Sequence, residues 1–370
     1  RLMQGAAAAL LAGCSMASSP PATAAEPPFV TSEVASFTTP WAMDFLPGSG
    51  RALTNAALVS ERDGRLWLVD VATGAKQAVS GVPQVLVAGQ GGLGDVAVLM
   101  EGLGRYRVYL SFVEAGPNGT SGAALGYGTL DRGEGEPRID GFKIIWRQSP
   151  KVEGAGHFAH RIDFGPDGFL YLTSGDRQKL DPAQDRSNDL GKVLRLTKEG
   201  QPAPGNPIPE NPAIWSYGHR NPLGIAFAPD GRLWESEMGP EGGDEVNLIL
   251  PGRNYGWPKA SNGSHYGGEN IPDHQRGDGF EPPKVWWNPA ISPGGLMIYT
   301  GSAFRGWTGD AFLPALSGQA LIRVDLNGDK ARKADQWPMN ARIRAVEQGP
   351  NGELFLLEDK GRMLKLVPRK

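Results

Sequence analysis

Histidines, arginines and acidic residues are concentrated in three stretches of the sequence, residues 154–168, 217–258 and 341–352. Together these stretches contain three of the five histidines, which are His157, His160 and His219. An imidazole titrates close to neutral pH, so a histidine beside a bound substrate is suited to act as a general base. Each of these histidines could equally be a packed residue. The stretches therefore supply candidates for proton-transfer chemistry, not yet an assignment.

The middle stretch contains a loop, residues 237–245, that is rich in glycine and in carboxylates. Backbone carbonyls around Gly239 and Pro240, together with the acidic side chains, are the hard oxygen ligands that calcium prefers. The loop therefore indicates a calcium site.

The third stretch contains Arg342-Ile343-Arg344. Because side chains alternate across a strand, both guanidinium groups would lie on one face. There they could bind a ligand with several carboxylates bidentately. The same pattern would also suit the solvent-exposed face of a surface strand.

The elements that must position these residues are short strands, because one unit recurs along the chain. Each copy is a tight turn of Asp-Gly, Asn-Gly or Gly-Arg type followed by a strand rich in Leu, Tyr, Trp and Phe. The best copies begin at Asp63, Pro166, Pro229 and Pro350, and weaker ones begin at Gly104 and Gly294. No stretch shows the sustained apolar period of an amphipathic helix. The repeat predicts an all-β fold, a six-bladed β-propeller of four-stranded antiparallel blades, with the chemistry on loops at one end of its channel.

The composition is that of an ordinary globular protein: of 370 residues 21% are charged, and the net charge is −3. This charge gives no electrostatic reason to bind nucleic acid. The closed sheet edges of a propeller favour a monomer.

The start of the chain has the character of an export signal. An apolar stretch, residues 3–13, is too short to span a bilayer, and a small, Pro-rich linker follows it. The letters LLAGC end at Cys14, the only cysteine, and resemble the lipobox of bacterial lipoproteins. We therefore predict a signal and the start of a linker in residues 1–26, a propeller domain in residues 27–370, and an exported protein that is tethered through lipidated Cys14. The alternative is a soluble periplasmic protein that is cleaved near Ala25.

Several motifs together carry a resemblance to a known family. They are GQGGLGDVAV from Gly89, HFAHRIDFGPDGFLYLTSGD from His157, GHRNP from Gly218, the loop GPEGGDEVN and NYGWP. Their order and spacing resemble the PQQ-dependent aldose sugar dehydrogenases, which are relatives of bacterial soluble glucose dehydrogenase. The resemblance extends from about Pro40 to Leu366.

The resemblance implies oxidation of an aldose at its anomeric carbon, C1, to the lactone, with pyrroloquinoline quinone (PQQ) as the hydride acceptor. His157 would be the general base and Arg220 would stabilise charge on the quinone. The cofactor would be bound by residues from several blades: Gln90, Arg220, Asn221, Trp287, Arg342 and Arg344.

Two kinds of calcium site are implied as well. At the active site, the carbonyls of Gly239 and Pro240 would hold a calcium ion together with PQQ. A structural calcium would use the Glu245 side chain and the Tyr255 carbonyl.

The sequence departs from the family pattern at a few positions. Ser317 stands where relatives commonly have a lysine that pairs with a PQQ carboxylate, so PQQ binding should be weaker unless Arg323 or Lys360 substitutes. His160 stands where relatives usually have a small residue, and we interpret it as structural. Gly94 interrupts a run that is usually Leu-Leu.

Two other functions remain open from the sequence. One is a calcium-dependent lactonase-type hydrolase, and the other is a non-catalytic, lipid-tethered scaffold that has lost PQQ. Sugar specificity is expected in the loop at residues 263–283. No CxxCH haem motif is present, so electrons would leave to a quinone or to another redox protein.

Overall fold

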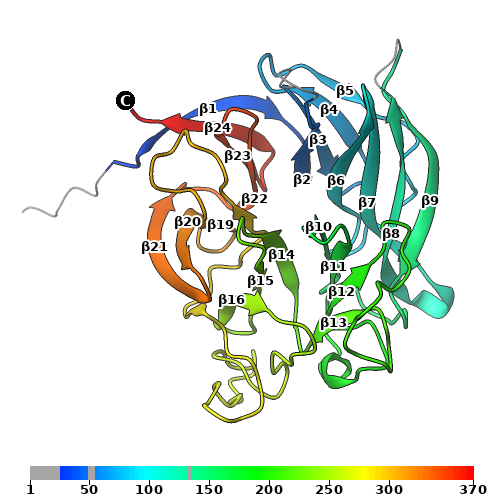
Figure 1. Ribbon diagram of the computed structural model, residues 1–370, viewed down its shortest axis with the longest axis vertical. Coiled ribbons are helices and arrows are strands. Elements are labelled where there is room, and N and C mark those ends of the chain that lie inside the picture. The colour runs from blue at the N-terminus through cyan, green and yellow to red at the C-terminus, as the bar shows by residue number, and fades with distance from the viewer. Residues whose placement is uncertain (1–25, 49–54, 132–134) are drawn as a thin grey trace, which may run out of the picture.

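The structure is a computed structural model that describes residues 26–48, 55–131 and 135–370. In this part of the chain, 24 strands form six antiparallel sheets of four strands each. The sheets are arranged as blades around a central channel (Figure 1). This confirms the predicted six-bladed β-propeller. Cys14 and the rest of the expected leader lie outside the described residues.

Helix is almost absent from the described residues, where only two short 3₁₀ turns occur, η1 (Pro117–Gly119) and η2 (Asp181–Gln184). None of the described helices is long and apolar enough to cross a membrane.

The blades are numbered in chain order, and the strands of each blade follow from the innermost to the outermost. Blades 1 to 3 are β2 (Pro40–Phe45), β3 (Ala56–Glu61), β4 (Leu66–Asp70) and β5 (Lys76–Ala78); β6 (Leu93–Gly102), β7 (Arg105–Ala115), β8 (Ser121–Asp131) and β9 (Ile139–Arg147); and β10 (Ala159–Phe164), β11 (Leu170–Ser174), β12 (Lys192–Leu196) and β13 (Ile214–Tyr217). Blades 4 to 6 are β14 (Pro222–Phe227), β15 (Leu233–Glu237), β16 (Asp244–Ile249) and β17 (Val285–Trp287); β18 (Met297–Ile298), β19 (Ala311–Ala315), β20 (Ala320–Asn327) and β21 (Lys330–Pro338); and β22 (Ile343–Gln348), β23 (Leu354–Glu358), β24 (Arg362–Pro368) and β1 (Phe29–Ser36).

Blade 6 closes the ring with both ends of the described chain. Its outermost strand, β1, pairs antiparallel with β24, from Phe29 opposite Pro368 to Ser36 opposite Arg362. This pairing ties the first blade to the last and leaves no open gap in the circle of sheets.

The structure corrects the phase of the repeat in two blades. In blades 2, 3, 4 and 6 the repeated turn joins the innermost strand to the second strand. In blade 1 the copy at Asp63 lies instead between β3 and β4, and in blade 5 the copy at Gly294 leads into the innermost strand β18. A polar turn followed by an apolar strand is common to every hairpin, so the pattern alone does not say which hairpin of a blade it belongs to.

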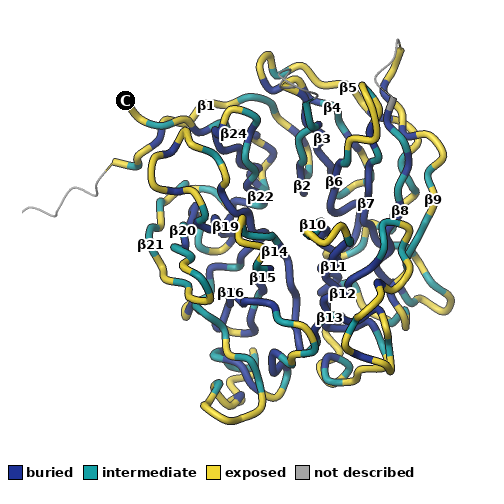
Figure 2. Tube along the Cα trace, in the orientation of Figure 1, coloured by how far each residue is buried: buried dark blue, intermediate teal, exposed yellow. Residues whose placement is uncertain are grey.

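The hydrophobic core lies between the blades. Six clusters of buried apolar side chains each join two neighbouring blades, and the buried residues follow the strands while the exposed ones follow the loops (Figure 2). For example, Leu58 of blade 1 packs with Val108 of blade 2, and both are fully buried. Each blade is therefore stabilised on both faces.

Carboxylates on the innermost strands join three of the blades to the next one. Asp44 of β2 accepts the Val98 N–H at 2.7 Å, Asp95 of β6 accepts the Ile162 N–H at 2.8 Å, and Asp163 of β10 accepts the Phe227 N–H at 2.9 Å. Each of these bonds ties an innermost strand to the innermost strand of the next blade.

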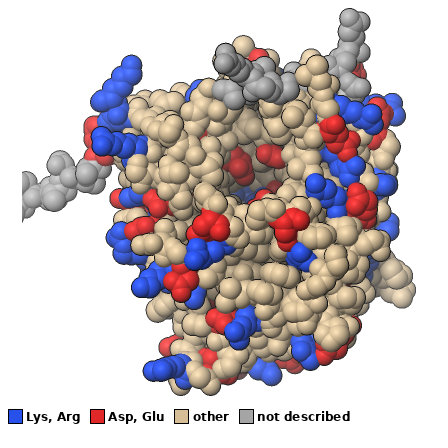
Figure 3. Space-filling model, viewed as in Figure 1, with Lys and Arg blue, Asp and Glu red and all other residues tan. Residues whose placement is uncertain are grey.

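The channel contains a cavity of about 410 Å³ at the end where the innermost strands terminate. Asp44, Asp163 and Glu347 line it, and acidic side chains are visible in the central hollow of the face shown in Figure 3. Burial raises the pKa of both Asp44 and Asp163 to about 7, and it raises the pKa of Glu347 well above the usual range. These three carboxyls therefore stay protonated at acidic pH.

Arg161 of β10 crosses the channel at the inner end of this cavity. Its guanidinium donates to the Leu223 carbonyl at 2.8 Å, to Asp95 at 3.0 Å and to the Gly294 carbonyl at 2.5 Å. One buried side chain therefore connects blade 3 to blades 4 and 2 and to the segment that enters blade 5.

We predict that Asp44→Asn changes how stability depends on pH. In the unfolded chain an aspartate ionises near pH 4, whereas in the folded protein Asp44 stays protonated up to about pH 7, so its contribution to folding is lost as the pH rises between these values. Asp44 is only half-buried, and solvent screening reduces the effect, so the variant should gain about 1–2 kcal/mol relative to the wild type between pH 4 and pH 8. Urea unfolding at both pH values measures this change. Asp140→Asn at an exposed site is the control, and an equal response of both variants would contradict the prediction.

Candidate active site

A second cavity, of about 220 Å³, lies at the opposite end of the channel, where the innermost strands begin. It is lined by Gln90 before β6, Asn221 before β14, and Arg342 and Arg344 at the start of β22. These four predicted cofactor-binding residues come from three blades. They meet because the chain enters each blade at the same end of the channel.

His157 is held beside this cavity by contacts to both its backbone and its ring. Gln90 Oε1 accepts the His157 backbone N–H at 2.8 Å, and Asp176 Oδ1 lies 2.7 Å from His157 Nδ1. The backbone of His157 is left-handed, with φ of 48°, a conformation that costs energy and is maintained by such contacts. The structure thus places the predicted base next to a predicted cofactor residue.

Asp176 determines which nitrogen of His157 can take up a proton. Its other oxygen accepts the indole N–H of Trp257 at 2.7 Å, and Oδ1 also accepts the Gln178 N–H at 2.8 Å. A carboxylate can only accept, so Nδ1 of His157 carries the proton and Nε2 has a free lone pair. Burial lowers the pKa of His157, although Asp176 opposes this effect, so the ring is neutral and able to act as a base near pH 7.

The roles of Asp176 and Trp257 were not predicted from the sequence, although both residues lie within the motifs described above. Asp176 follows the buried strand β11, and Trp257 belongs to NYGWP. For Asp176, the available signal was a charged residue just beyond the end of a buried strand. Arg62, which also lines the cavity and donates to the Gly89 carbonyl at 2.6 Å, was missed as well.

Arg220 and Asn221 are both buried, and both have orphaned polar atoms. Arg220 donates to the Met238 carbonyl at 3.1 Å and to the Tyr266 hydroxyl at 3.4 Å, and its guanidinium lies 5.2 Å from the Trp257 ring. Arg220 Nε and Asn221 Oδ1 have no hydrogen-bond partner in the described part of the chain. Buried polar atoms are rarely left unpaired, so these two fit a site that binds a polar ligand.

Arg342 and Arg344 lie on the same face, as the alternation predicted. Both donate to Asp359, at 2.9 Å from Arg342 Nε and 2.9 Å from Arg344 Nε. The Arg344 guanidinium also lies 4.5 Å from the ring of Trp41, which lines the cavity. One carboxylate balances only one of the two cations, so the pair keeps positive charge for an anionic ligand.

Trp287 is not among the residues that line the cavity, whereas Ser317 lies at its edge, beside the lining residues Ser292 and Leu316. Trp287 lies in β17, the outermost strand of blade 4, and packs in the hydrophobic cluster between blades 4 and 5. Ser317 is exposed, and its hydroxyl lies 2.8 Å from the hydroxyl of Ser292. Arg323 does not replace the missing lysine, because it pairs with Asp310 and Asp335.

The loop with Gly239 and Pro240 follows β15 and is fixed by Asp244. The Asp244 carboxylate accepts the N–H groups of Gly239, Ile291 and Ser292. Among the described residues, neither the Gly239 nor the Pro240 carbonyl accepts a hydrogen bond. Both oxygens are therefore available to a cation.

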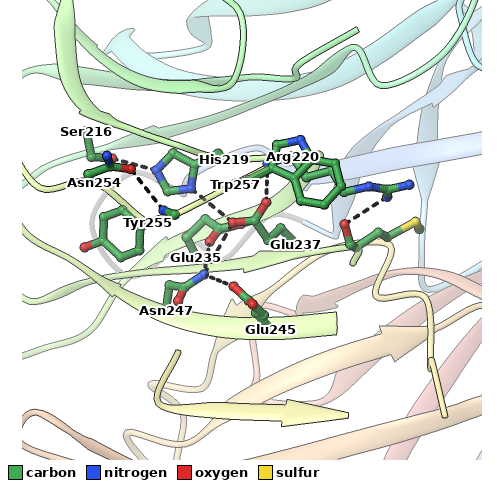
Figure 4. A network of polar contacts seen from close by, with 12 residues as sticks. Ser216, His219, Arg220, Glu235, Glu237, Glu245, Asn247, Asn254, Tyr255 and Trp257 are labelled. Carbon is green, nitrogen blue, oxygen red and sulfur yellow. Dashed lines mark hydrogen bonds and ion pairs between the residues drawn. The ribbon is translucent and has the colours of Figure 1, made fainter. Parts of the chain in front are cut away.

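Glu245 belongs to a buried grid of polar side chains between blades 3 and 4 (Figure 4). In the strand register, Glu237 of β15 is opposite Glu245 of β16, and Glu235 is opposite Asn247. His219 Nδ1 lies 3.1 Å from Glu237, and the His219 ring stacks on Tyr255 at 4.7 Å. His219 is thus packed, in keeping with the structural alternative.

This grid contains three carboxyl groups, of Glu235, Glu237 and Glu245, and only one histidine among the described residues lies within hydrogen-bond distance of them. Burial, with the charge of Glu237 as a second cause, raises the pKa of Glu235 and Glu245 well above the usual range. Glu235 Oε1 and Asn247 Oδ1 have no partner in the described residues. A hole of about 10 Å³, the size of one water or ion, is lined by Glu237, Glu245, Gly239 and Tyr255. The donor set is oxygen-rich and fits a divalent cation.

Comparisons with known proteins agree with the motifs. The family described as Glucose / Sorbosone dehydrogenase matches residues 37–365. The aldose sugar dehydrogenase YliI of Escherichia coli (strain K12) is 37% identical over 342 residues, which cover 89% of this chain and 90% of that protein. The apo-form structure of the soluble aldose sugar dehydrogenase (Asd) from Escherichia coli has a TM-score of 0.85 at 34% identity and covers 92% of this chain and 100% of that one.

A further solved structure is the PQQ-bound form of the aldose sugar dehydrogenase (Adh) from Streptomyces coelicolor. It has a TM-score of 0.77 at 31% identity and covers 93% of this chain and 100% of that one. The resemblance inferred from the motifs is thus confirmed, and the chain belongs to the glucose/sorbosone dehydrogenase family.

Proposed function

We propose that this enzyme oxidises aldose sugars at C1 to the lactone, with PQQ as the hydride acceptor and with calcium. The observation that carries the proposal is the His157–Asp176 pair, 2.7 Å apart, beside a cavity lined by Gln90, Asn221 and three arginines. A neutral base next to a cationic pocket is the arrangement that removal of a hydroxyl proton beside an anionic cofactor requires.

The residues of the cavity are suited to hold PQQ. Arg342 and Arg344 would bind its carboxylates, and Gln90, Asn221 and Arg220 would bind its polar edges. When bound, PQQ supplies an ortho-quinone that accepts two electrons as a hydride. The orphaned atoms Arg220 Nε and Asn221 Oδ1 support this fit.

His157 Nε2 would accept the proton of the C1 hydroxyl. The imidazolium that forms is stabilised by Asp176, whose position is fixed by Trp257. The Arg220 guanidinium is oriented by the Met238 carbonyl and the Tyr266 hydroxyl, which accept its hydrogen bonds. It is placed to stabilise negative charge that develops during the reaction.

Calcium would bind at two places. One is the pair of carbonyls from Gly239 and Pro240, where the ion would act as a Lewis acid. The other is the hole between Glu245 and the Tyr255 carbonyl, where it would neutralise the buried carboxylates of the grid.

Tyr266 is placed to contact the sugar. It lies in the loop in which specificity was expected, and it is 75% exposed although its hydroxyl reaches the buried Arg220. The loop is attached to the calcium loop through paired hydrogen bonds between Glu241 and Ser264. The apolar face of a sugar packs well on such a ring.

We also propose that the enzyme acts outside the cytoplasm as a monomer that is tethered through lipidated Cys14 and passes its electrons to a quinone or to a redox protein. The leader pattern in residues 1–26 and the closed ring of blades support these assignments.

The proposed need for PQQ and calcium can be tested with the apo-protein. Dye-linked oxidation of an aldose by the apo-protein should require both PQQ and calcium, and a chelator should abolish it. Calcium alone at about 100 times its Kd should also stabilise the apo-protein, by about 2.7 kcal/mol, and Glu245→Gln should reduce this gain. Binding of no PQQ would support the scaffold function instead, and turnover of a lactone without PQQ would support the hydrolase.

The proposed role of His157 as general base can be tested by two substitutions. His157→Ala should lower kcat by a factor of about 10²–10⁴, and Asp176→Asn should lower it by about 10²-fold because the ring loses its fixed orientation. The Kd for PQQ should change little in both variants, which serves as the control for folding. Full activity of His157→Ala would exclude the assigned mechanism.

The proposed contact between Tyr266 and the sugar can be tested by substitution of this residue. Tyr266→Ala should raise KM for the aldose by about 3–10-fold through lost stacking. Tyr266→Phe keeps the ring and loses only the 3.4 Å contact with Arg220, so its KM should stay close to that of the wild type. Steady-state kinetics at saturating PQQ measure both variants. An unchanged KM in Tyr266→Ala would show that the ring does not contact the sugar.

A further inference from the structure

His160 and Gly94, two departures from the family pattern, are complementary in the structure. The His160 ring is buried between blades 2 and 3 and lies directly against Gly94. A Cβ atom on residue 94 would be only 1.9 Å from His160 Cε1. Glycine therefore provides the space in which this imidazole fits.

Ser111 determines the tautomer of His160. The Ser111 hydroxyl oxygen accepts the Asp95 N–H at 2.9 Å and lies 2.8 Å from His160 Nδ1. Ser111 is fully buried, and its hydroxyl proton has no acceptor other than His160 Nδ1 among the described residues. An unpaired buried hydroxyl is costly, so the hydroxyl donates to Nδ1 and the ring proton is on Nε2.

The ring is also neutral. Burial, followed by the charge of the adjacent Arg161, lowers the pKa of His160 to about 3. His160 therefore has a single N–H group, on Nε2, at any pH at which the enzyme would work.

His160 lines the same cavity as Gln90 and Asn221, and Nε2 has no partner in the described part of the chain. We propose that His160 is a cofactor-binding residue whose Nε2–H donates a hydrogen bond to an oxygen of PQQ. This inference rests on the proposed function. It adds a neutral, oriented donor beside the arginines that line the cavity.

A purely structural histidine would fill the space beside Gly94 and do nothing else. His160→Phe separates the two roles, because it keeps a ring of similar size and removes the N–H. His160→Gln is the matched variant, because its side-chain amide still offers an N–H donor.

The experiment measures the Kd for PQQ in calcium by titration of the apo-proteins, with thermal unfolding of each apo-protein as the control for folding. We expect His160→Phe to weaken PQQ binding by about 5–20-fold, as loss of one hydrogen bond would, and His160→Gln to recover part of the affinity. Equal Kd values for the wild type and for His160→Phe would overturn the inference while leaving the proposed function intact.

A second measurement does not depend on how a variant folds. In protein with ¹⁵N-labelled histidine, the ring signals of only five histidines must be assigned. His160 should show the Nε2–H tautomer in the calcium-loaded apo-protein, and addition of PQQ should shift its Nε2 signal. An Nδ1–H tautomer, or an Nε2 signal unaffected by bound PQQ, would refute the inference. A wild type that binds no PQQ would overturn both the inference and the proposed function.

Discussion

The guanidinium of Arg161 is the contact on which the centre of the molecule depends. A buried cation is costly unless it is fully paired, and Arg161 is paired with Asp95 and with carbonyls of Leu223 and Gly294. These partners belong to different blades, so the side chain fixes the distance between them across the channel. It also lies 5.9 Å from the ring of Trp41 in blade 1. The same residue thus supports the floor of the cofactor cavity and bounds the acidic cavity on the other side.

The active-site backbone is strained just before this anchor. His157, Ala159 and His160 all have positive φ values, of 48°, 56° and 60°. Each such residue costs of order 1–3 kcal/mol and persists only where its surroundings hold it. The segment is held from several directions, by Gln90, by Asp176 and by the Ser111 hydroxyl on His160. This backbone conformation directs the His157 ring towards Asp176 and places the His160 ring in the wall of the cavity.

The buried carboxylates fall into two groups with different needs. Asp44 and Asp163 each accept an amide N–H of the next blade, and protonation up to about pH 7 limits their charge. Glu235, Glu237 and Glu245 are instead packed together with one histidine and one amide side chain, and Glu235 keeps an unpaired oxygen. The first group is satisfied by the protein itself, whereas the second is suited to a cation. This contrast is the physical basis of the proposed calcium site between blades 3 and 4.

The sequence by itself determined the propeller and its six blades, because turns and apolar strands are local patterns. Through the family resemblance of its motifs it also pointed to Gln90, Asn221, Arg342 and Arg344, which line one cavity. Local patterns did not reveal which hairpin the repeat occupies in blades 1 and 5, since every hairpin of a blade has the same pattern. They also did not reveal that Trp287 lies in an outermost strand. Only the tertiary structure showed that Asp176 orients His157 and that Trp257, 81 residues further on, orients Asp176. It also showed that Gly94 makes room for His160. Such pairs are brought together by the closing of the ring, which places side chains from different blades within hydrogen-bond distance.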